Sequence, residues 1–336
     1  MGEFELLARI RERLPAPSSR IRLGSGDDAA ITVPGRATAT SVDALVDGVH
    51  FRRDLATPEQ IGHKALATAL SDLAAMGAEP GEAYVVLGIP PDFADDDCIE
   101  LLDGMIALAQ RTGTALAGGD LTRAGELFLA VTVVGHAPDP DSLIHRGGAG
   151  PGDALVLTGE IGAAAAGLQL LEASDCAINH AIRGSIPRSA SNWEEALRAR
   201  QLQPIPRLGA GQALARAGAT AMIDLSDGLG SDAGHIAKRS GVGLRIDAES
   251  IPLAAGSKKL MAAVGRDPWE LLSGGEDYEL LATIPPERLT EAQRRVQEGE
   301  KGIALTEIGV VVAGSGVEIR LPGGRLLEPA GFDQLA

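Results

Sequence analysis

Cysteine and aromatic residues are scarce in this 336-residue chain. The two cysteines, Cys98 and Cys176, form no CxxC pair, so the sequence predicts neither a disulfide framework nor a zinc site and fits a reducing compartment. Aromatic residues make up 3% of the chain, so the core must be built mainly from Ala, Val, Leu and Ile. With 45% hydrophobic residues, the composition is still that of an ordinary globular protein.

Basic residues are also few relative to acidic ones. Thirty Lys and Arg stand against 46 Asp and Glu, which gives a net charge of −16 and opposes binding to nucleic acid or to an anionic membrane. The N-terminal stretch MGEFELLARIRERL carries charges throughout and has neither a signal-peptide core nor a bilayer-length span. Leu6 also breaks the myristoylation pattern. We therefore expect an unanchored, soluble protein of the cytoplasm.

Several common site motifs are missing. The chain has no GxxxxGK[ST] phosphate loop, no HExxH and no GxSxG elbow. LGSGDDAA at 23–30 matches GxGxxA, but the adjoining AAITV predicts a strand, whereas a dinucleotide fingerprint requires a helix there. A Rossmann-type nucleotide site is therefore disfavoured.

The hydrophobic periodicity predicts alternating helices and strands. We expect a helix over 57–80, capped by Thr57 with Gln60 completing a capping box, and a strand where ATATSVDALV stands at 37–46. The other expected helices are 2–14, 99–112, 160–173 and one on each side of the strand 221–224, after a polar region that ends near 205. The other expected strands are 84–89, 114–119, 126–137, 154–159, 221–224, 242–247, 278–284, 303–312 and 317–322. This alternation indicates an α/β or α+β fold with a helix-covered sheet.

The chain length suggests two domains. The segment PDPDSLIHRGGAGPGD at 138–153, rich in Pro, Gly and Asp, is the best boundary. We therefore expect an N-terminal domain over 1–138 and a C-terminal α/β domain over 139–336.

The chemistry-bearing residues are aspartates that end apolar runs or adjoin glycine: Asp27, Asp28, Asp43, Asp72, Asp120, Asp224 and Asp227. Taken singly, each is more typical of a turn or a helix cap. Asp72, however, lies inside the predicted 57–80 helix, where a cap role is excluded. Oxygen ligands without His or Cys favour hard cations, Mg²⁺ first and Mn²⁺ or Ca²⁺ next. Glycine beside Asp also admits an anion to backbone N–H groups, and a helix that starts after Ser226-Asp227-Gly228 would direct its positive end at that anion. The residues therefore indicate Mg-nucleotide chemistry.

The motifs GSGDDAA, SVDALVDGVHF, HKALATALSDLAAMGAEP, GGDLTR, HRGGAGPGD, IDLSDGLGSDAGHIA and LSGGEDYELLAT, in this order, resemble the bacterial thiamine-monophosphate kinases of the aminoimidazole ribonucleotide synthetase-like superfamily. The resemblance implies transfer of the γ-phosphoryl group of ATP to thiamine monophosphate, in the biosynthesis of thiamine diphosphate. It implies a homodimer whose N-terminal domains join their sheets and bind ATP and Mg²⁺, and a C-terminal domain that completes the site.

The resemblance also implies roles for individual residues. The metal ligands would be Asp28, Ser41, Val42, Asp43, Asp72, Asp120, Asp224 and Asp227, with Asp27 a further candidate and Val42 acting through its backbone. The ATP contacts would be Gly119, Asp120, Arg146 and Ser226, and the substrate contacts would be His50, Glu276 and Phe332. A carboxylate and an aromatic ring suit a cationic thiazolium. Asp232 matches no ligand position and is expected to be solvated or locally bonded.

Two positions depart from the family pattern. Leu102 stands where an aromatic residue commonly touches adenine, and Leu121 follows the aspartate of GGD where the family has Thr. Neither residue is a proposed metal ligand, so the departures bear on the base and phosphate contacts alone.

The reaction that the resemblance implies needs no general base. Its nucleophile is a phosphate oxygen, which is largely ionised near neutral pH because the second pKa of a phosphate monoester is about 6. No catalytic side chain is therefore expected beyond those that position metal and phosphate, and catalysis would rest on alignment and charge neutralisation by Mg²⁺.

Alternatives remain open at this point. Another ATP-dependent enzyme of the superfamily is one, although selenophosphate synthetases need a reactive residue near the N-terminus and hydrogenase-maturation relatives end in cysteine, whereas this chain ends GFDQLA. A non-catalytic module that binds Ca²⁺, Mg²⁺ or nucleotide is another. A carboxylate-pair glycosidase fits poorly, because the chain has only 2 Trp and 2 Tyr for a sugar cleft.

Overall fold

The computed structural model describes residues 9–10, 12–14, 20–23, 31–34, 37–173 and 192–331. The chain divides into two compact units, Met1–Leu73 with Ala78–Ser142, and Ala74–Gly77 with Leu143–Ala336. We call these the N-terminal unit and the C-terminal unit and describe each by itself. Among the described residues, no helix is both long and apolar enough to cross a membrane.

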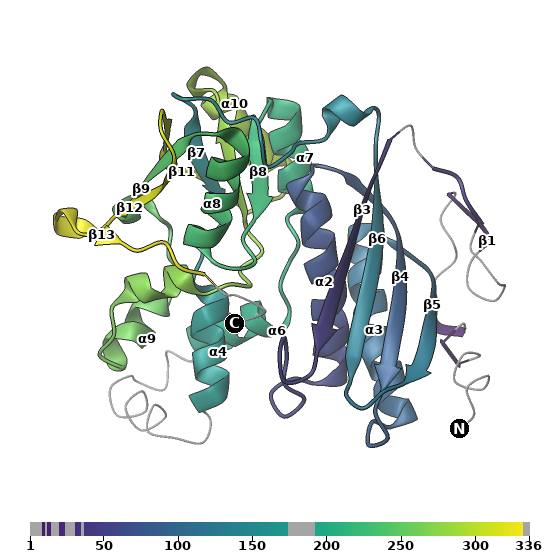
Figure 1. Cartoon of the computed structure of the whole chain (residues 1–336). Coiled ribbons are helices and arrows are strands. Elements are labelled where there is room, and N and C mark those ends of the chain that lie inside the picture. The colour runs from purple at the N-terminus through teal and green to yellow at the C-terminus, as the bar shows by residue number, and fades with distance from the viewer. Residues whose placement is uncertain are drawn as a thin grey trace. The chain divides into compact units, whose positions relative to one another are not determined.

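The N-terminal unit is a four-stranded sheet with two helices on one face (Figure 1). The strand order is β3-β6-β4-β5, in which β4 and β5 are parallel and the other pairs antiparallel. Its elements are β3 (Ala37–Val46), α2 (Pro58–Ala75), β4 (Glu79–Ile89), α3 (Asp95–Thr112), β5 (Ala115–Arg123) and β6 (Phe128–Ala137), and a separate ribbon pairs β1 (Ile21–Leu23) with β2 (Ile31–Thr32).

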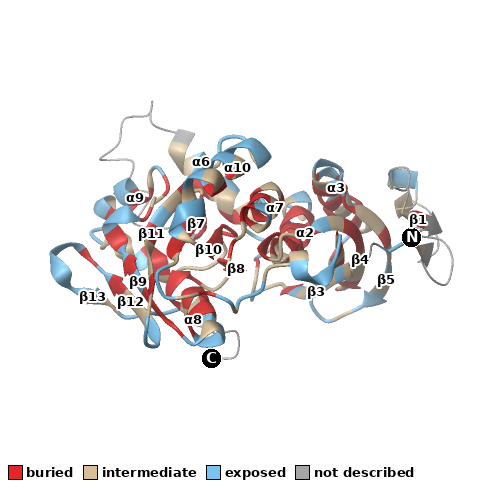
Figure 2. Ribbon diagram, turned by 90° about the horizontal axis from the view of Figure 1, so that it is seen from above, coloured by how far each residue is buried: buried red, intermediate tan, exposed pale blue. Residues whose placement is uncertain are grey.

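The helices lie close to each other because glycine occupies their contact points. A Cβ atom on Gly62 of α2 would lie 1.8 Å from the carbonyl oxygen of Leu101, and one on Gly104 of α3 would lie 1.9 Å from that of Glu59. Around this contact, buried residues of α2 and α3 face the sheet (Figure 2). On β3 the residues alternate, and Val42 on the other face is 64% exposed, so that face of the sheet is open in the single chain.

The C-terminal unit holds a seven-stranded mixed sheet in the order β13-β12-β9-β11-β7-β10-β8. Its strands are β7 (Ala154–Thr158), β8 (Ala221–Asp224), β9 (Gly243–Asp247), β10 (Leu280–Ile284), β11 (Leu305–Val312), β12 (Gly316–Arg320) and β13 (Leu326–Leu327). Its helices are α4 (Ala163–Glu172), α6 (Asn192–Leu202), α7 (Leu208–Ala217), α8 (Leu229–Ser240), α9 (Ser257–Ala263) and α10 (Leu289–Gly299).

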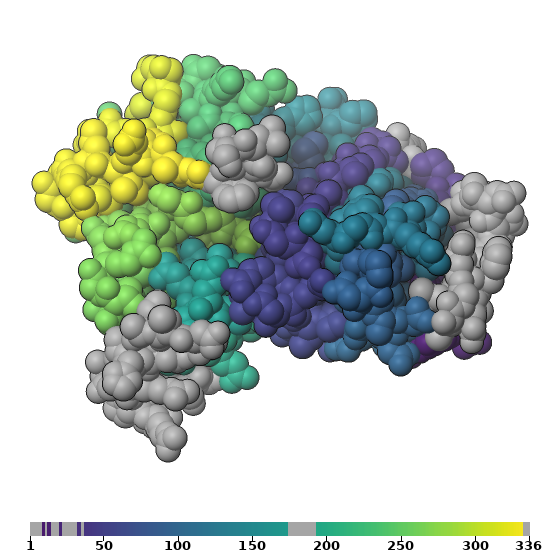
Figure 3. Space-filling view, turned by 60° about the horizontal axis from the view of Figure 1, so that its bottom comes forward, coloured from purple at the N-terminus to yellow at the C-terminus, as the bar shows by residue number. Residues whose placement is uncertain are grey.

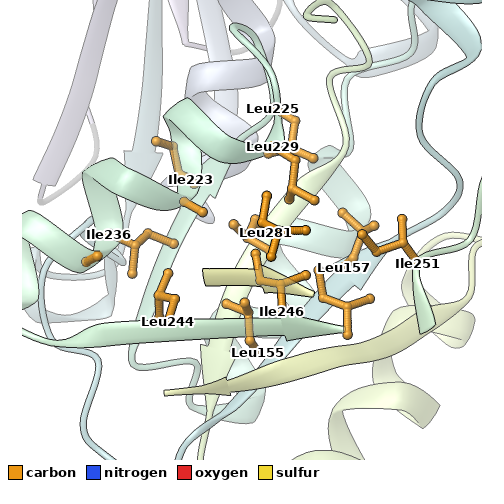
Figure 4. Packing of buried hydrophobic residues seen from close by; sticks show 14 of the residues in the cluster. Leu155, Leu157, Ile223, Leu225, Leu229, Ile236, Leu244, Ile246, Ile251 and Leu281 are labelled. Atoms are coloured by element: carbon orange, nitrogen blue, oxygen red, sulfur yellow. The ribbon is translucent and has the colours of Figure 1, made fainter. Parts of the chain in front are cut away.

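One apolar cluster packs α8 onto this sheet. Ile223 and Leu225 flank the end of β8, and Leu229 and Ile236 of α8 pack with Leu281 of β10 (Figure 4). In the space-filling view the yellow C-terminal strands border the green surface around α8 (Figure 3). Because the residues before and after the β8–α8 junction are buried in this cluster, the junction is held firmly in place.

The predicted α/β (α+β) fold class is confirmed. Helices α6, α9 and α10 and strands β1 and β13 were not predicted, and the other differences lie at element ends. The helix predicted over 57–80 ends at Ala75, because Gly77 adopts a φ of 67° and Glu79 begins β4. The strand predicted over 114–119 runs on to Arg123, because its backbone pairs with β4 as far as Ile89. The predicted helix 2–14 lies mostly outside the described residues; within it, 9–10 and 12–13 are helical and Leu14 forms a bend.

Candidate active site

Ser41, Asp43 and Asp72 lie at the β3 edge of the N-terminal sheet. Ser41 and Asp43 are two residues apart on β3 and share a face, and the Ser41 hydroxyl donates a short hydrogen bond to the Asp72 carboxylate. Val42 points to the opposite face, so only its backbone can join this group.

The expectation that Asp72 lies far from a helix end is wrong, because α2 stops at Ala75 and places Asp72 in the last turn. A carboxylate at this position faces the negative end of the helix dipole, which destabilises it by roughly 0.3–1 kcal/mol. The Ser41 hydroxyl supplies a compensating donor. Asp72 is thus held by β3 rather than by its own helix, at a position where a bound cation would be favourable.

His50 lies in the turn that follows β3. Its Nδ1 accepts the Val46 N–H at 3.1 Å, and its carbonyl oxygen accepts a hydrogen bond from Lys64 Nζ at 3.1 Å. Lys64 is a residue of α2 and is 4% exposed, so a buried ammonium group supports the turn. The accepting role of Nδ1 places the proton of the neutral ring on Nε2.

Gly119 and Asp120 lie within β5, at the other edge of the same sheet, and both are exposed. Two strands separate β5 from β3, so Asp120 is about 14 Å from the Asp43 edge at the usual strand spacing. A single chain therefore does not bring Asp120 to Asp43 and Asp72. Beside Asp120 lies a pocket of about 80 Å³ between α3 and β5, walled by apolar side chains that include Leu102 and Leu116.

Arg146 is exposed in the loop that leads into β7. The loop is fixed from both sides: the Met222 N–H donates to the His145 carbonyl at 3.0 Å, and the Ser240 hydroxyl accepts the Gly148 and Ala149 N–H groups at 3.1 and 3.2 Å. Ser240 is the last residue of α8. The guanidinium group is thus carried on a fixed backbone but remains accessible to an anion.

Asp224, Ser226 and Asp227 occupy the turn between β8 and α8. Asp224 is buried at the end of the strand, whereas Ser226 and Asp227 are half-buried. Gly228 then adopts φ 112° and ψ 150°, a conformation that other residues avoid, and starts α8. Two carboxylates and a hydroxyl are therefore presented on one short, well-packed turn.

The backbone N–H groups of this turn do not face solvent. Those of Ser226, Asp227 and Gly228 all donate to Oδ2 of Asp232, each at 3.1 Å. The expectation that these groups approach an anion from outside is therefore wrong, because a carboxylate of the same chain occupies them. On its other side the turn meets the Glu276 segment, because the Ser226 carbonyl oxygen accepts the Glu276 N–H at 2.9 Å.

Asp232 is 2% exposed, which rules out a solvated role and confirms the local bonding that was the other expectation. Burial raises its pKa to about 8, and the neighbouring Asp224 and Asp227 carboxylates act in the same direction, while the donated N–H groups oppose the rise. The sequence alone did not predict that Asp232 bonds to this turn. Its position four residues after Gly228, about one helical turn away, is consistent with such a contact.

Glu276 lies in the segment that pairs with the Ser226 turn. Its φ is 69°, and Tyr278 has a φ of 51°, so two non-glycine residues hold left-handed conformations that cost about 1 kcal/mol or more each. The Glu276 Oε2 accepts a hydrogen bond from Gln201 Nε2 at 2.6 Å, and the Tyr278 N–H donates to the Leu225 carbonyl at 2.9 Å. The sequence could not indicate that Gln201 contacts Glu276, because the two residues are 75 positions apart and Gln201 lies on α6.

Asp27, Asp28 and Phe332 lie outside the described residues. Gly331, which precedes Phe332, is described, and a Cβ atom there would lie 2.8 Å from the Asp227 carbonyl oxygen. Gly331 therefore lies against the Asp227 turn. Within the described ranges, no three His, Cys, Asp or Glu side chains gather as a metal-binding group.

Comparisons with known proteins agree with this architecture. The AIR synthase related protein models match at 26–137 for the N-terminal domain and at 150–322 for the C-terminal domain. The thiamine-monophosphate kinase of Salmonella typhimurium is 39% identical over 315 residues, which cover 93% of this chain and 91% of that protein.

Two solved structures are similar over nearly the whole chain. The thiamine-monophosphate kinase of Stenotrophomonas maltophilia has a TM-score of 0.79 and 36% identity and covers 96% of both chains. AaThiL complexed with AMPPCP and TMP has a TM-score of 0.74 and 29% identity over 98% of this chain and 96% of that one. The chain therefore belongs to the AIR synthase related proteins and, within them, to the family of thiamine-monophosphate kinases.

Proposed function

We propose that this protein transfers the γ-phosphoryl group of ATP to thiamine monophosphate and produces thiamine diphosphate and ADP. The family membership supports this reaction, as does a relative solved with the ATP analogue AMPPCP and TMP. The same reaction class makes the protein a phosphotransferase with a phosphate group as acceptor, in the pathway of thiamine diphosphate biosynthesis.

One hydrogen bond carries the proposal. The Glu276 N–H donates to the Ser226 carbonyl at 2.9 Å, so a residue proposed to meet the nucleotide adjoins a residue proposed to meet the thiamine ring. Phosphoryl transfer requires donor and acceptor to be held side by side in line. A backbone ladder that joins the two contact residues supplies such alignment.

The donor set fits Mg²⁺. The turn between β8 and α8 carries Asp224 and Asp227, and β3 carries Asp43 beside Ser41 and the Asp72 carboxylate, all of them oxygen donors. Hard oxygen ligands without His or Cys suit Mg²⁺. Bound there, Mg²⁺ would neutralise charge between the two phosphate groups. Asp28, Asp120 and the Val42 backbone complete the proposed ligand set, with Asp27 as a further candidate.

The remaining site residues would bind and orient the two substrates. Gly119, Asp120, Arg146 and Ser226 would hold the nucleotide, with Arg146 pairing with phosphate and the Leu102 pocket receiving the base. His50, Glu276 and Phe332 would hold the thiamine moiety, the carboxylate of Glu276 facing its cationic ring. No side chain needs to remove a proton, because the attacking phosphate oxygen is ionised near neutral pH.

We propose that two copies pair through the open face of the N-terminal sheet. The exposed Val42 and the alternation along β3 support an apolar contact on that face, and pairing would explain why Asp43 and Asp120 occupy opposite edges of one sheet. In this arrangement residues 1–138 form the ATP, Mg²⁺ and dimerisation domain, and residues 139–336 complete the site. Because ATP is a co-substrate, we propose a cytoplasmic location.

The experiment is incubation of the purified protein with ATP, Mg²⁺ and thiamine monophosphate, followed by chromatography. Equal amounts of ADP and thiamine diphosphate are expected, with neither formed when thiamine monophosphate or Mg²⁺ is left out. ADP release that does not depend on thiamine monophosphate would indicate a different acceptor. Nucleotide binding without any turnover by a folded protein would indicate a non-catalytic module and would contradict the proposal.

A further inference from the structure

The carboxylate of Asp232 is the centre of the turn between β8 and α8. A single oxygen, Oδ2, accepts three hydrogen bonds, from the N–H groups of Ser226, Asp227 and Gly228. The side chain is almost fully buried, so water does not replace these bonds. The three donors belong to consecutive residues, and their common acceptor fixes the path of the backbone over the whole turn.

These bonds differ from an ordinary helix cap. A capping side chain accepts from the first residues of its helix, which here begin at Leu229. Asp232 instead accepts from Gly228, the N-cap residue, and from the two residues before it. Its carboxylate therefore orders the loop that precedes the helix, and that loop carries the proposed ligand Asp227 and follows directly on Asp224.

The other side of the turn is held by the substrate segment. The carbonyl groups of Leu225 and Ser226 accept from the Tyr278 and Glu276 N–H groups at 2.9 Å. A Cβ atom on Gly275 would lie 2.1 Å from the Ser226 carbonyl oxygen, so the two segments are in direct backbone contact. With its carbonyl groups fixed on one side and its N–H groups on the other, the turn has little freedom to change shape.

We propose that Asp232 is a positioning residue of the phosphoryl-transfer site: by gathering three N–H groups on one oxygen, it holds the Asp224 and Asp227 carboxylates in the arrangement that binds the divalent cation. The inference rests on the proposed function for the role of that cation. It assigns Asp232 no contact with substrate or metal. Its effect passes entirely through the geometry of the Ser226–Gly228 backbone.

The test compares Asp232→Ala with Asp232→Asn. Asparagine keeps one carbonyl oxygen that can accept the three N–H groups, whereas alanine leaves them without an acceptor. Loss of a group that orients metal ligands typically weakens metal affinity by about 10- to 100-fold, so Asp232→Ala should raise the Mg²⁺ concentration for half-maximal activity by about that factor. Asp232→Asn should stay much nearer to the native value. At saturating Mg²⁺, the KM for thiamine monophosphate should be unchanged in both variants.

Direct Mn²⁺ binding, measured by electron paramagnetic resonance without substrates, separates this inference from the proposed function. Mn²⁺ affinity should fall in Asp232→Ala whether or not the wild-type protein phosphorylates thiamine monophosphate. His235→Ala, an exposed position on the same helix, is the matched control and should bind Mn²⁺ normally. If Asp232→Ala does not fold, Asp232→Ser replaces it, because the serine hydroxyl is too short to reach three donors. Equal effects of Ala and Asn would assign the role to charge rather than to the gathered N–H groups and would overturn the proposal, as would native Mn²⁺ affinity in a folded Ala variant.

Discussion

Arg207 and Glu279 form a two-pronged ion pair inside the C-terminal unit. Nε and Nη2 of Arg207 donate to the two carboxylate oxygens of Glu279 at 2.8 and 2.6 Å, and the side chains are 5% and 0% exposed. Arg200 and Thr158 donate to the same carboxylate at 2.7 Å each. Glu279 follows the strained residues Glu276 and Tyr278, so the pair anchors the end of the proposed substrate segment.

Removing one partner of this pair should destabilise the protein strongly. Arg207→Met leaves the Glu279 carboxylate buried with less compensation, and we expect the free energy of unfolding to fall by about 3–5 kcal/mol in urea denaturation. Arg245→Met, on an exposed position of β9, is the control and should change little. The double variant Arg207→Met/Glu279→Met should regain part of the loss. Native-like stability of the single variant would show that the pair contributes little.

Asp277 should make stability depend on pH. Burial raises its pKa to about 6, although the Gly162 and Ala164 N–H groups donate to it at 2.7 and 3.1 Å. Because the folded state binds this proton more tightly than the unfolded chain, ionisation of Asp277 costs stability as pH rises from about 4 to about 6. The free energy of unfolding of the wild type should fall by about 1 kcal/mol between pH 5 and pH 7 relative to Asp277→Asn. Parallel pH profiles for the two proteins would exclude this effect.

Asp43 and Asp227 should each be required for turnover with Mg²⁺. Asp43→Asn and Asp227→Asn replace proposed ligands by neutral amides, and since loss of supporting groups alone costs about 10- to 100-fold in affinity, the loss should exceed about 100-fold. Asp141→Asn, at an exposed position, is the control for a removed charge. ADP and thiamine diphosphate are quantified by chromatography. Near-normal turnover in either variant would remove that aspartate from the metal ligands.

Leu102 should affect ATP without affecting thiamine monophosphate. It lines the pocket beside Gly119 and Asp120, and truncation to alanine removes apolar contact worth about 1.5 kcal/mol, or about tenfold in affinity. Leu102→Ala should therefore raise the KM for ATP by up to that factor and leave the KM for thiamine monophosphate unchanged. Leu168→Ala, a partly exposed leucine of α4, serves as the control. An unchanged KM for ATP would place the base elsewhere.

The local structure of the candidate site can be predicted from residues that are close together in the sequence. An apolar run, a turn with glycine and a new helical period predict the β8–α8 junction, and α8 does begin at Leu229 directly after Gly228. The end of α2 was harder to predict: the apolar pattern continues past Ala75, but Gly77 and the start of β4 override it. That shift moved Asp72 from mid-helix to the last turn, although its assignment to the site came from the resemblance rather than from the helix.

By itself, the sequence determined the alternation of helices and strands, the family and the aspartates that end apolar runs, because these depend on residues close together in the chain. Tertiary structure alone decided that Ser41 binds Asp72, that Gln201 binds Glu276 and that Arg207 neutralises Glu279, since 31, 75 and 72 residues separate these partners. It also decided the role of Asp232. Burial under the β8–α8 junction withholds water from its carboxylate, and three N–H groups take the place of that water.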